Sequence, residues 1–261
     1  MKSKSTGSKK VRPGKKSPGN SKSAGSRKPE IRTEPGKISP ATIQFLKGLK
    51  KNNNREWFHA HKDEYDAAAT EFVGFVRVLI ERLTKVDPTL SQVSPAECLF
   101  RIYRDVRFSS DKSPYKPHLS AFIAVGGRKS RYAGYYVHIQ PGYNFMGGGV
   151  YHPEAEELES IRRAIASRGG ELRKIINNQT FKKSFKEMEG DRLKRVPRAY
   201  SEDHPMADLI CWKDFIVSRS IPDAILTKDL IGECIKHFKI LKPFNVWLSR
   251  AVGEPSVRTA G

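Results

Sequence analysis

The chain has 261 residues, with 48 Lys and Arg against 28 Asp and Glu, a formal net charge of +20 at pH 7. Hydrophobic residues make up 38%, below a typical globular average, so we expect part of the chain to contribute nothing to a core. Three cysteines without C-x-x-C spacing argue against a disulfide framework or a zinc cluster and favour a reducing compartment. No run approaches 18 apolar residues and the start, MKSKSTGSKK, has no apolar segment, which argues against a membrane span and favours a cytoplasmic protein.

The positive charge is unevenly distributed. Residues 1–37 hold 12 Lys and Arg and two acids, a net of +10, and the remaining residues hold 36 basic and 26 acidic residues, also +10. Because residues 1–38 are otherwise rich in Ser, Gly and Pro, we predict a disordered basic tail there. Two interpretations stay open: a tether that binds nucleic acid weakly, without sequence preference and less as salt rises, and a solubilising extension.

Hydrophobic spacing predicts helices at both ends of the rest of the chain. A short helix is expected over about residues 40–50, and Asn54 is a good N-cap for the next helical segment. Apolar residues from Tyr65 to Leu83 repeat every three to four positions and predict a long amphipathic helix. Later helices are predicted from Pro153 to a stop at Gly169-Gly170, and over residues 171–178, 180–189, 227–239 and 243–252.

Between these helical regions the repeat changes to two residues. Strands are predicted over residues 99–108, 119–125, 134–140 and 144–151, with a fifth over 213–219, and short turn signals separate most of them. We therefore predict one α+β domain over residues 39–253, an antiparallel sheet of four to five strands flanked by helices, with a flexible C-terminus at 254–261.

Alternation along the predicted strands defines a candidate ligand site. Along 134–140 it turns Tyr136, His138 and Gln140 away from an apolar face of Tyr135, Val137 and Ile139. Along 100–108 it separates a mainly apolar face from a polar one that contains Asp105. If both polar faces lie on one side of the sheet, with lysines from the following loop, the candidate ligand-binding residues are Arg101, Tyr103, Arg107, Lys112, Lys116, Tyr136 and His138.

This set of side chains suits an anion. Arginine offers a planar donor fork to phosphate or carboxylate, lysine offers a point charge, and histidine changes charge near neutral pH. The alternative is a polar sheet face that simply meets water. The glycines at 147–149 could present backbone N–H groups to a phosphate, but close backbone packing is the favoured interpretation.

Arg104 lies on the mainly apolar side of the 100–108 pattern. A guanidinium there needs either a route to water or a carboxylate partner, and we expect Glu56 or Asp63 to supply it. His59 and His61 are two residues apart and do not share a helical face, so no metal site is predicted. The spacing of the remaining polar residues identifies no catalytic group and no cofactor.

Several segments, taken in order, resemble the bacterial family called domain of unknown function 2461. The resemblance covers about residues 41–252 and rests on these stretches: 53–58 (NNREWF), 100–109 (FRIYRDVRFS), 111–116 (DKSPYK), 134–142 (GYYVHIQPG), 147–151 (GGGVY) and 203–205 (DHP). Gln140 stands where many relatives are expected to have an acid. The resemblance implies no established reaction, cofactor or catalytic residue.

Three functional hypotheses follow from the sequence. The first is binding, or processing, of a phosphate-bearing or other anionic small molecule at the polar sheet face. The second is a non-enzymatic protein that associates with nucleic acid through residues 1–37 and the domain surface. The third is a structural or interaction module. No membrane partner is expected.

Overall fold

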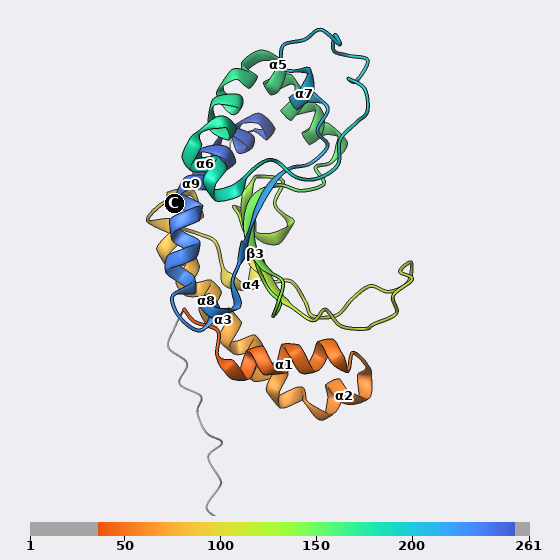
Figure 1. Cartoon of the computed structure of the whole chain (residues 1–261), viewed down its shortest axis with the longest axis vertical. Coiled ribbons are helices and arrows are strands. Elements are labelled where there is room, and N and C mark those ends of the chain that lie inside the picture. Colours follow the sequence, from red (N-terminus) through yellow and green to blue (C-terminus); the bar gives the residue numbers. More distant parts are fainter. Residues whose placement is uncertain (1–35, 254–261) are drawn as a thin grey trace, which may run out of the picture. The chain divides into compact units, whose positions relative to one another are not determined.

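The computed structural model describes residues 36–253 (Figure 1). The predicted tail, apart from residues 36–38, and the predicted C-terminus lie outside the described residues. The elements in chain order are α1 (Pro40–Lys51), α2 (Arg55–Ala60), α3 (Lys62–Thr84), η1 (Pro88–Leu90), α4 (Pro95–Cys98), β1 (Leu119–Ile123), η2 (Gly127–Lys129), β2 (Gly134–Ile139), β3 (Asn144–Val150), α5 (Ala155–Asn177), α6 (Gln179–Phe185), α7 (Ala207–Ile210), β4 (Phe215–Ile221), α8 (Asp223–Leu226) and α9 (Leu230–Val252).

The four strands form one antiparallel meander in the order β1-β2-β3-β4. The predicted α+β fold with an antiparallel sheet is therefore confirmed. In the register, Ala121 pairs with Val137, Val137 with Met146, and Met146 with Arg219, so three of these four positions put apolar side chains on one face. No helix in the described part of the chain is long and apolar enough to cross a membrane.

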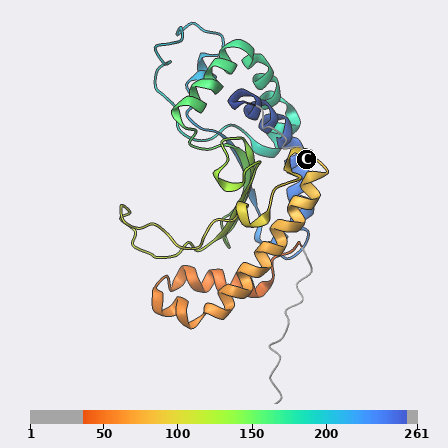
Figure 2. The same ribbon diagram turned by 180° about the vertical axis from the view of Figure 1, so that it is seen from behind.

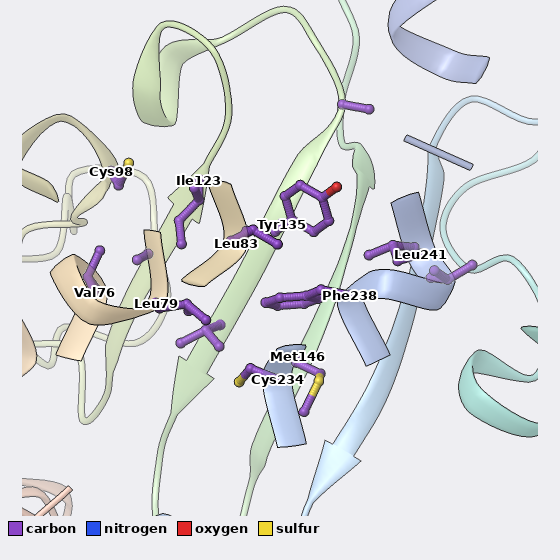
Figure 3. Close-up of a cluster of buried hydrophobic side chains, with 14 of the residues drawn as sticks. Val76, Leu79, Leu83, Cys98, Ile123, Tyr135, Met146, Cys234, Phe238 and Leu241 are labelled. Atoms are coloured by element: carbon purple, nitrogen blue, oxygen red, sulfur yellow. The ribbon is translucent and has the colours of Figure 1, made fainter. Parts of the chain in front are cut away.

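Helices α3 and α9 cover that apolar face of the sheet (Figure 3). Val76, Leu79 and Leu83 project from α3, while Phe238 and Leu241 project from α9 toward the strands. All five side chains are fully buried. No helix lies across the opposite face in the described part of the chain (Figures 1 and 2). That face remains available for a site.

Side-chain caps fix where several helices begin. Ser39 Oγ accepts from the backbone N–H of Thr42 at the start of α1, and Asn54 Oδ1 accepts from the N–H of Trp57 at the start of α2. These bonds satisfy donors that lack a partner in the first helical turn. The predicted N-cap at Asn54 is confirmed, and Ile38, just before α1, is already part of the core.

The predicted strand over residues 99–108 is wrong. Leu99 forms a single bridge to Ala121 of β1, and beyond it the chain pairs with its own returning limb through a bridge between Tyr103 and Tyr115. The resulting loop projects away from the sheet (Figures 1 and 2). Two residues of the returning limb, Pro114 and Pro117, have no N–H to donate, so a continuous ladder cannot form there.

The predicted helix break at Gly169-Gly170 lies one residue from a kink in α5. Arg168, whose φ is −140° and ψ is 25°, is non-helical and joins two helical segments, the second of which ends at Asn177. A predicted helix boundary nearer the C-terminus is wrong. The two predicted C-terminal helices are one helix, α9, which contains Pro243. Leu241 and Phe244 beside this proline are fully buried, so tertiary packing holds the helix together across the missing hydrogen bond.

Candidate functional site

The uncovered face of the sheet is the floor of a pocket of about 1110 Å³. Because side chains alternate along strands, the register sets polar and aromatic residues side by side in two rows across the floor. One row is Ser120, His138, Phe145 and Ser220, and the next is Phe122, Tyr136, Gly147 and Ser218.

Two histidines meet at one end of this floor. The ring centroids of His118 and His138 are 4.0 Å apart, and His138 stacks on Phe145 at 4.6 Å. His138 Nδ1 is 3.2 Å from the hydroxyl of Tyr136 and Nε2 is 3.2 Å from Oε1 of Gln140. An amide oxygen only accepts, so this geometry places the ring hydrogen on Nε2 and lets Nδ1 accept from the tyrosine O–H.

Both imidazoles are neutral near pH 7. Burial lowers the pKa of His138 below its ordinary value. Burial, together with the neighbouring His138 and Lys116, lowers the pKa of His118 to about 3. The pair therefore carries no positive charge at this pH, and the change of charge expected of His138 moves to lower pH.

Lys116 supplies positive charge at the same end of the pocket. Its Nζ lies 5.6 Å from the ring centroid of Phe100, and its pKa is lowered by burial and by the nearby guanidinium groups of Arg101 and Arg104. No carboxylate of the described residues forms an ion pair with Lys116. A partly buried ammonium beside two other cations favours an anion as its partner.

Charge is asymmetric across the pocket. The cations come from segments joined to β1: Lys116 before it, and Arg128, Lys129 and Arg131 after it. The acids come from segments that follow β3 or adjoin β4: Glu154, Glu157, Glu189 and Asp223. Most of the acids already accept hydrogen bonds inside the protein, as Asp223 does from the side-chain amide of Asn144 at 2.6 Å. The β1 side is therefore the more attractive to an anion.

The glycines of β3 allow its backbone to approach its neighbours. A Cβ at Gly147 would lie 2.2 Å from the carbonyl oxygen of Val217, and one at Gly149, whose φ is +116°, would lie 1.9 Å from that of Phe215. No side chain larger than hydrogen fits there. The geometry supports close backbone packing over a phosphate-binding nest.

Two of the predicted site residues line the pocket, Lys116 and Tyr136. A third, His138, is buried beside it against the lining residues His118 and Phe145. The other four, Arg101, Tyr103, Arg107 and Lys112, lie on the projecting loop, because residues 99–108 are not part of the sheet. Arg107 is held by Asp105, with Nη2 and Oδ2 2.7 Å apart, and Lys112 Nζ donates to the backbone oxygen of Val106.

Arg104 has an acidic partner, but neither of the expected ones. Its guanidinium pairs with Asp111 on the returning limb of the same loop and remains partly exposed. Hydrogen bonds from Ser113, together with the ion pair with Arg104, hold the pKa of Asp111 well below its ordinary value. The prediction of Glu56 or Asp63 is therefore wrong: the loop folds back on itself and supplies the carboxylate locally.

Sequence reasoning missed His118, Phe145 and the basic residues at 128–131. His118 could have been found by extending the two-residue alternation of Ser120 and Phe122 one step backward. The basic turn carries no local signal that it borders a pocket.

A second polar cluster has the composition of a hydrolase triad but not its accessibility. Ser184 Oγ lies 2.5 Å from Nδ1 of His237, and Nε2 of the same ring lies 2.9 Å from Oε1 of Glu233. Ser184 is 5% exposed and His237 4% exposed. A substrate cannot reach a hydroxyl buried between α6 and α9, so this cluster joins the two helices as a structural network. The described residues contain no group of three or more His, Cys, Asp or Glu that could hold a metal ion.

The fold and the pocket define an α+β protein with a half-covered antiparallel sheet and a ligand-sized hollow on its open face. The chain belongs to the family described as "Conserved hypothetical protein (DUF2461)", whose family model matches residues 41–247. The resemblance noted from the sequence is therefore confirmed. No curated protein matches the chain, and no solved structure does.

Proposed function

We propose that the open face of the sheet binds a small organic anion with a flat, ring-containing body, such as a phosphate-bearing molecule. The observation that carries the proposal is the ammonium of Lys116, which is partly buried at the pocket edge and has no carboxylate partner among the described residues. A bound anion would satisfy this charge.

The aromatic floor supports the ring. Tyr136 and Phe145 have ring centroids 5.5 Å apart, and Phe100 lies 6.2 Å from Tyr136 at the edge nearest Lys116. Flat rings stack favourably on such surfaces. A volume of about 1110 Å³ is comparable with that of known small-molecule pockets. The neutral imidazole of His118 lines the pocket and would be the group to accept a proton from the ligand, which is the basis for proposing processing as well as binding.

Paired ligands test this proposal against an ordinary wet sheet face. Thermal unfolding is measured with adenosine monophosphate against adenosine, benzoate against benzyl alcohol, and inorganic phosphate. The anion of at least one pair should raise the unfolding temperature more than its neutral analogue does. Calorimetry with that anion should show a loss of about 10- to 100-fold in affinity for Lys116→Met, the loss of one charge-assisted contact.

The controls separate charge in the pocket from charge elsewhere. Lys47→Met removes an exposed lysine of α1 and should leave affinity unchanged, while Lys116→Arg should retain most of it. Equal stabilisation by anions and neutral analogues, or equal affinity in wild type and Lys116→Met, would refute the proposal.

Association with nucleic acid is the second candidate function. It is favoured by the net charge of +10 on residues 1–37, from 12 basic and two acidic residues. Such a segment attracts phosphate backbones through counterion release.

We also propose a cytoplasmic location, because Cys98, Cys211 and Cys234 are all free thiols buried in the fold.

A further inference from the structure

A second hollow, of about 670 Å³, lies between the C-terminal end of α3 and the first half of α9. We call it the α3–α9 groove. It shares no lining residue with the sheet pocket, and the inference drawn from it rests on the second candidate function, association with nucleic acid. Its lining contains six cations: Lys37, Arg82, Lys85, Lys228, Lys236 and Lys239.

The described residues supply little negative charge at this groove. Asp229 is the one acid among the described lining residues, and its Oδ1 accepts from the backbone N–H of Gly232 at the start of α9. Lys236 lies 3.6 Å from Glu233, whose carboxylate also binds His237. Four basic side chains of the groove form no ion pair with the described residues: Arg82, Lys85, Lys228 and Lys239.

The other lining residues narrow the class of partner. The apolar ones, Val78, Val86, Ile231 and Ile235, are half-buried, and no aromatic side chain lines the groove. Stacking of single-stranded bases requires exposed rings, and insertion into a bilayer requires exposed apolar side chains. The large exposed hydrophobic residues of the described chain, such as Phe108 and Tyr151, lie outside the groove. The groove therefore suits a partner whose contacts with it are made by phosphate groups, without base stacking or insertion of apolar groups.

The sequence before the groove extends the same charge. Gly36 and Lys37 are themselves part of the lining. Residues 1–35, which connect directly to them, contain 11 Lys and Arg and two acids, a net of +9. A partner bound at the groove would thus meet further cations along the chain, and a long polyanion makes use of both.

We propose that the α3–α9 groove binds the phosphate backbone of double-stranded nucleic acid without sequence preference. Arg82 and Lys85 contact phosphates from the α3 side, and Lys228 and Lys239 contact them from the α9 side. Each neutralised phosphate releases condensed counterions, so each lysine contributes to the steepness with which affinity falls as salt rises.

The test uses the full chain and a fluorescently labelled mixed-sequence duplex, with binding followed by anisotropy across a salt series. The triple variant Lys85→Gln, Lys228→Gln and Lys239→Gln removes three exposed charges and leaves residues 1–37 intact. With about 0.9 of slope per phosphate contact, the plot of log affinity against log salt should become less steep by about 2.7, three times 0.9. The triple Lys→Arg variant at the same positions keeps the charge and should keep the wild-type slope.

The matched control is Lys47→Gln, Lys50→Gln and Lys51→Gln, which removes three exposed lysines from α1. Its salt slope should equal that of wild type, and unfolding temperatures should show that all variants are folded. Equal slopes in the groove variant and wild type would overturn the proposal and assign any binding to other cations. So would unchanged duplex binding accompanied by a loss of binding to phosphatidylserine vesicles, which would identify the groove as a membrane surface.

Discussion

Replacing Asp214 with Ala should destabilise the fold strongly, although this residue touches no predicted ligand. Its side chain is 2% exposed. Its carboxylate accepts from the backbone N–H of His152 at 2.8 Å and from that of Asp191 at 2.9 Å, which joins the loop after β3 to the loop after α6. A hydrogen bond to a charged group contributes about 1.5–3 kcal/mol, so losing both should lower the free energy of unfolding by about 3–6 kcal/mol.

Urea denaturation of wild type and Asp214→Ala measures this difference directly. Asp191→Ala is the matched control on the same loop: its side chain is 66% exposed and pairs with Lys213 at 3.0 Å. An exposed ion pair of this kind contributes about 0–1 kcal/mol, so this variant should be nearly as stable as wild type. Equal losses of stability in the two variants would refute this expectation, because the two hydrogen bonds to the Asp214 carboxylate would then contribute nothing measurable.

Two further predictions concern pH and glycine. The pKa of His118 is near 6.5 in the unfolded chain and about 3 in the folded protein, so the unfolded state binds more protons between these two pH values. The free energy of unfolding should therefore be highest above pH 6.5 and fall by up to about 2 kcal/mol by pH 5. Denaturation at pH 8 and pH 5 checks this, with a smaller difference expected for His118→Asn than for His59→Asn, and a flat wild-type profile contradicting it. Gly149→Ala should destabilise the protein or prevent folding, because the added Cβ would clash with the Phe215 backbone oxygen and the residue has a φ of +116°. Gly170→Ala, where the added Cβ meets open space on α5, should be neutral or stabilise by up to about 1 kcal/mol in the same assay. A Gly149→Ala variant as stable as wild type would refute the close packing.

Local signals predicted the parts of the fold that depend on local patterns. Alternation along residues 134–140 correctly separated Tyr135, which is part of the hydrophobic core, from Tyr136, which lines the pocket, and His138, which stacks on the lining residue Phe145. Helical spacing and the N-cap at Asn54 located the first helices in the same way. These features depend on residues within a few positions of one another, and a single sequence contains that information.

The errors arose where distant residues decide the structure. The same alternation occurs along residues 99–108, but a contact outside this segment decides its structure. Asn53, which is 62 positions from Tyr115 in the sequence, donates from its side-chain amide to the backbone oxygen of Tyr115 and accepts from the Tyr115 N–H. These two bonds anchor the returning limb of the loop near α2. No pattern within the loop reports this contact. Arg101 and Arg107 were therefore predicted on a sheet face to which they do not belong. The structural role of Asp214 was not predicted, because its hydrogen-bond partners lie 23 and 62 positions away in the sequence.

Each outer strand of the sheet is paired on its open side by one bridge residue, β1 by Leu99 and β4 by Glu189. These bridges affect how readily the protein aggregates in a crowded solution. A sheet edge with free N–H and C=O groups is a template on which another chain can add a strand and start an aggregate. At β1 the N–H of Phe100 donates to the oxygen of Ser120, and at β4 the N–H of Glu189 donates to the oxygen of Ile216. The chain thus covers part of both edges with its own backbone, and β1 is only five residues long. Intermolecular strand pairing would first have to displace these segments.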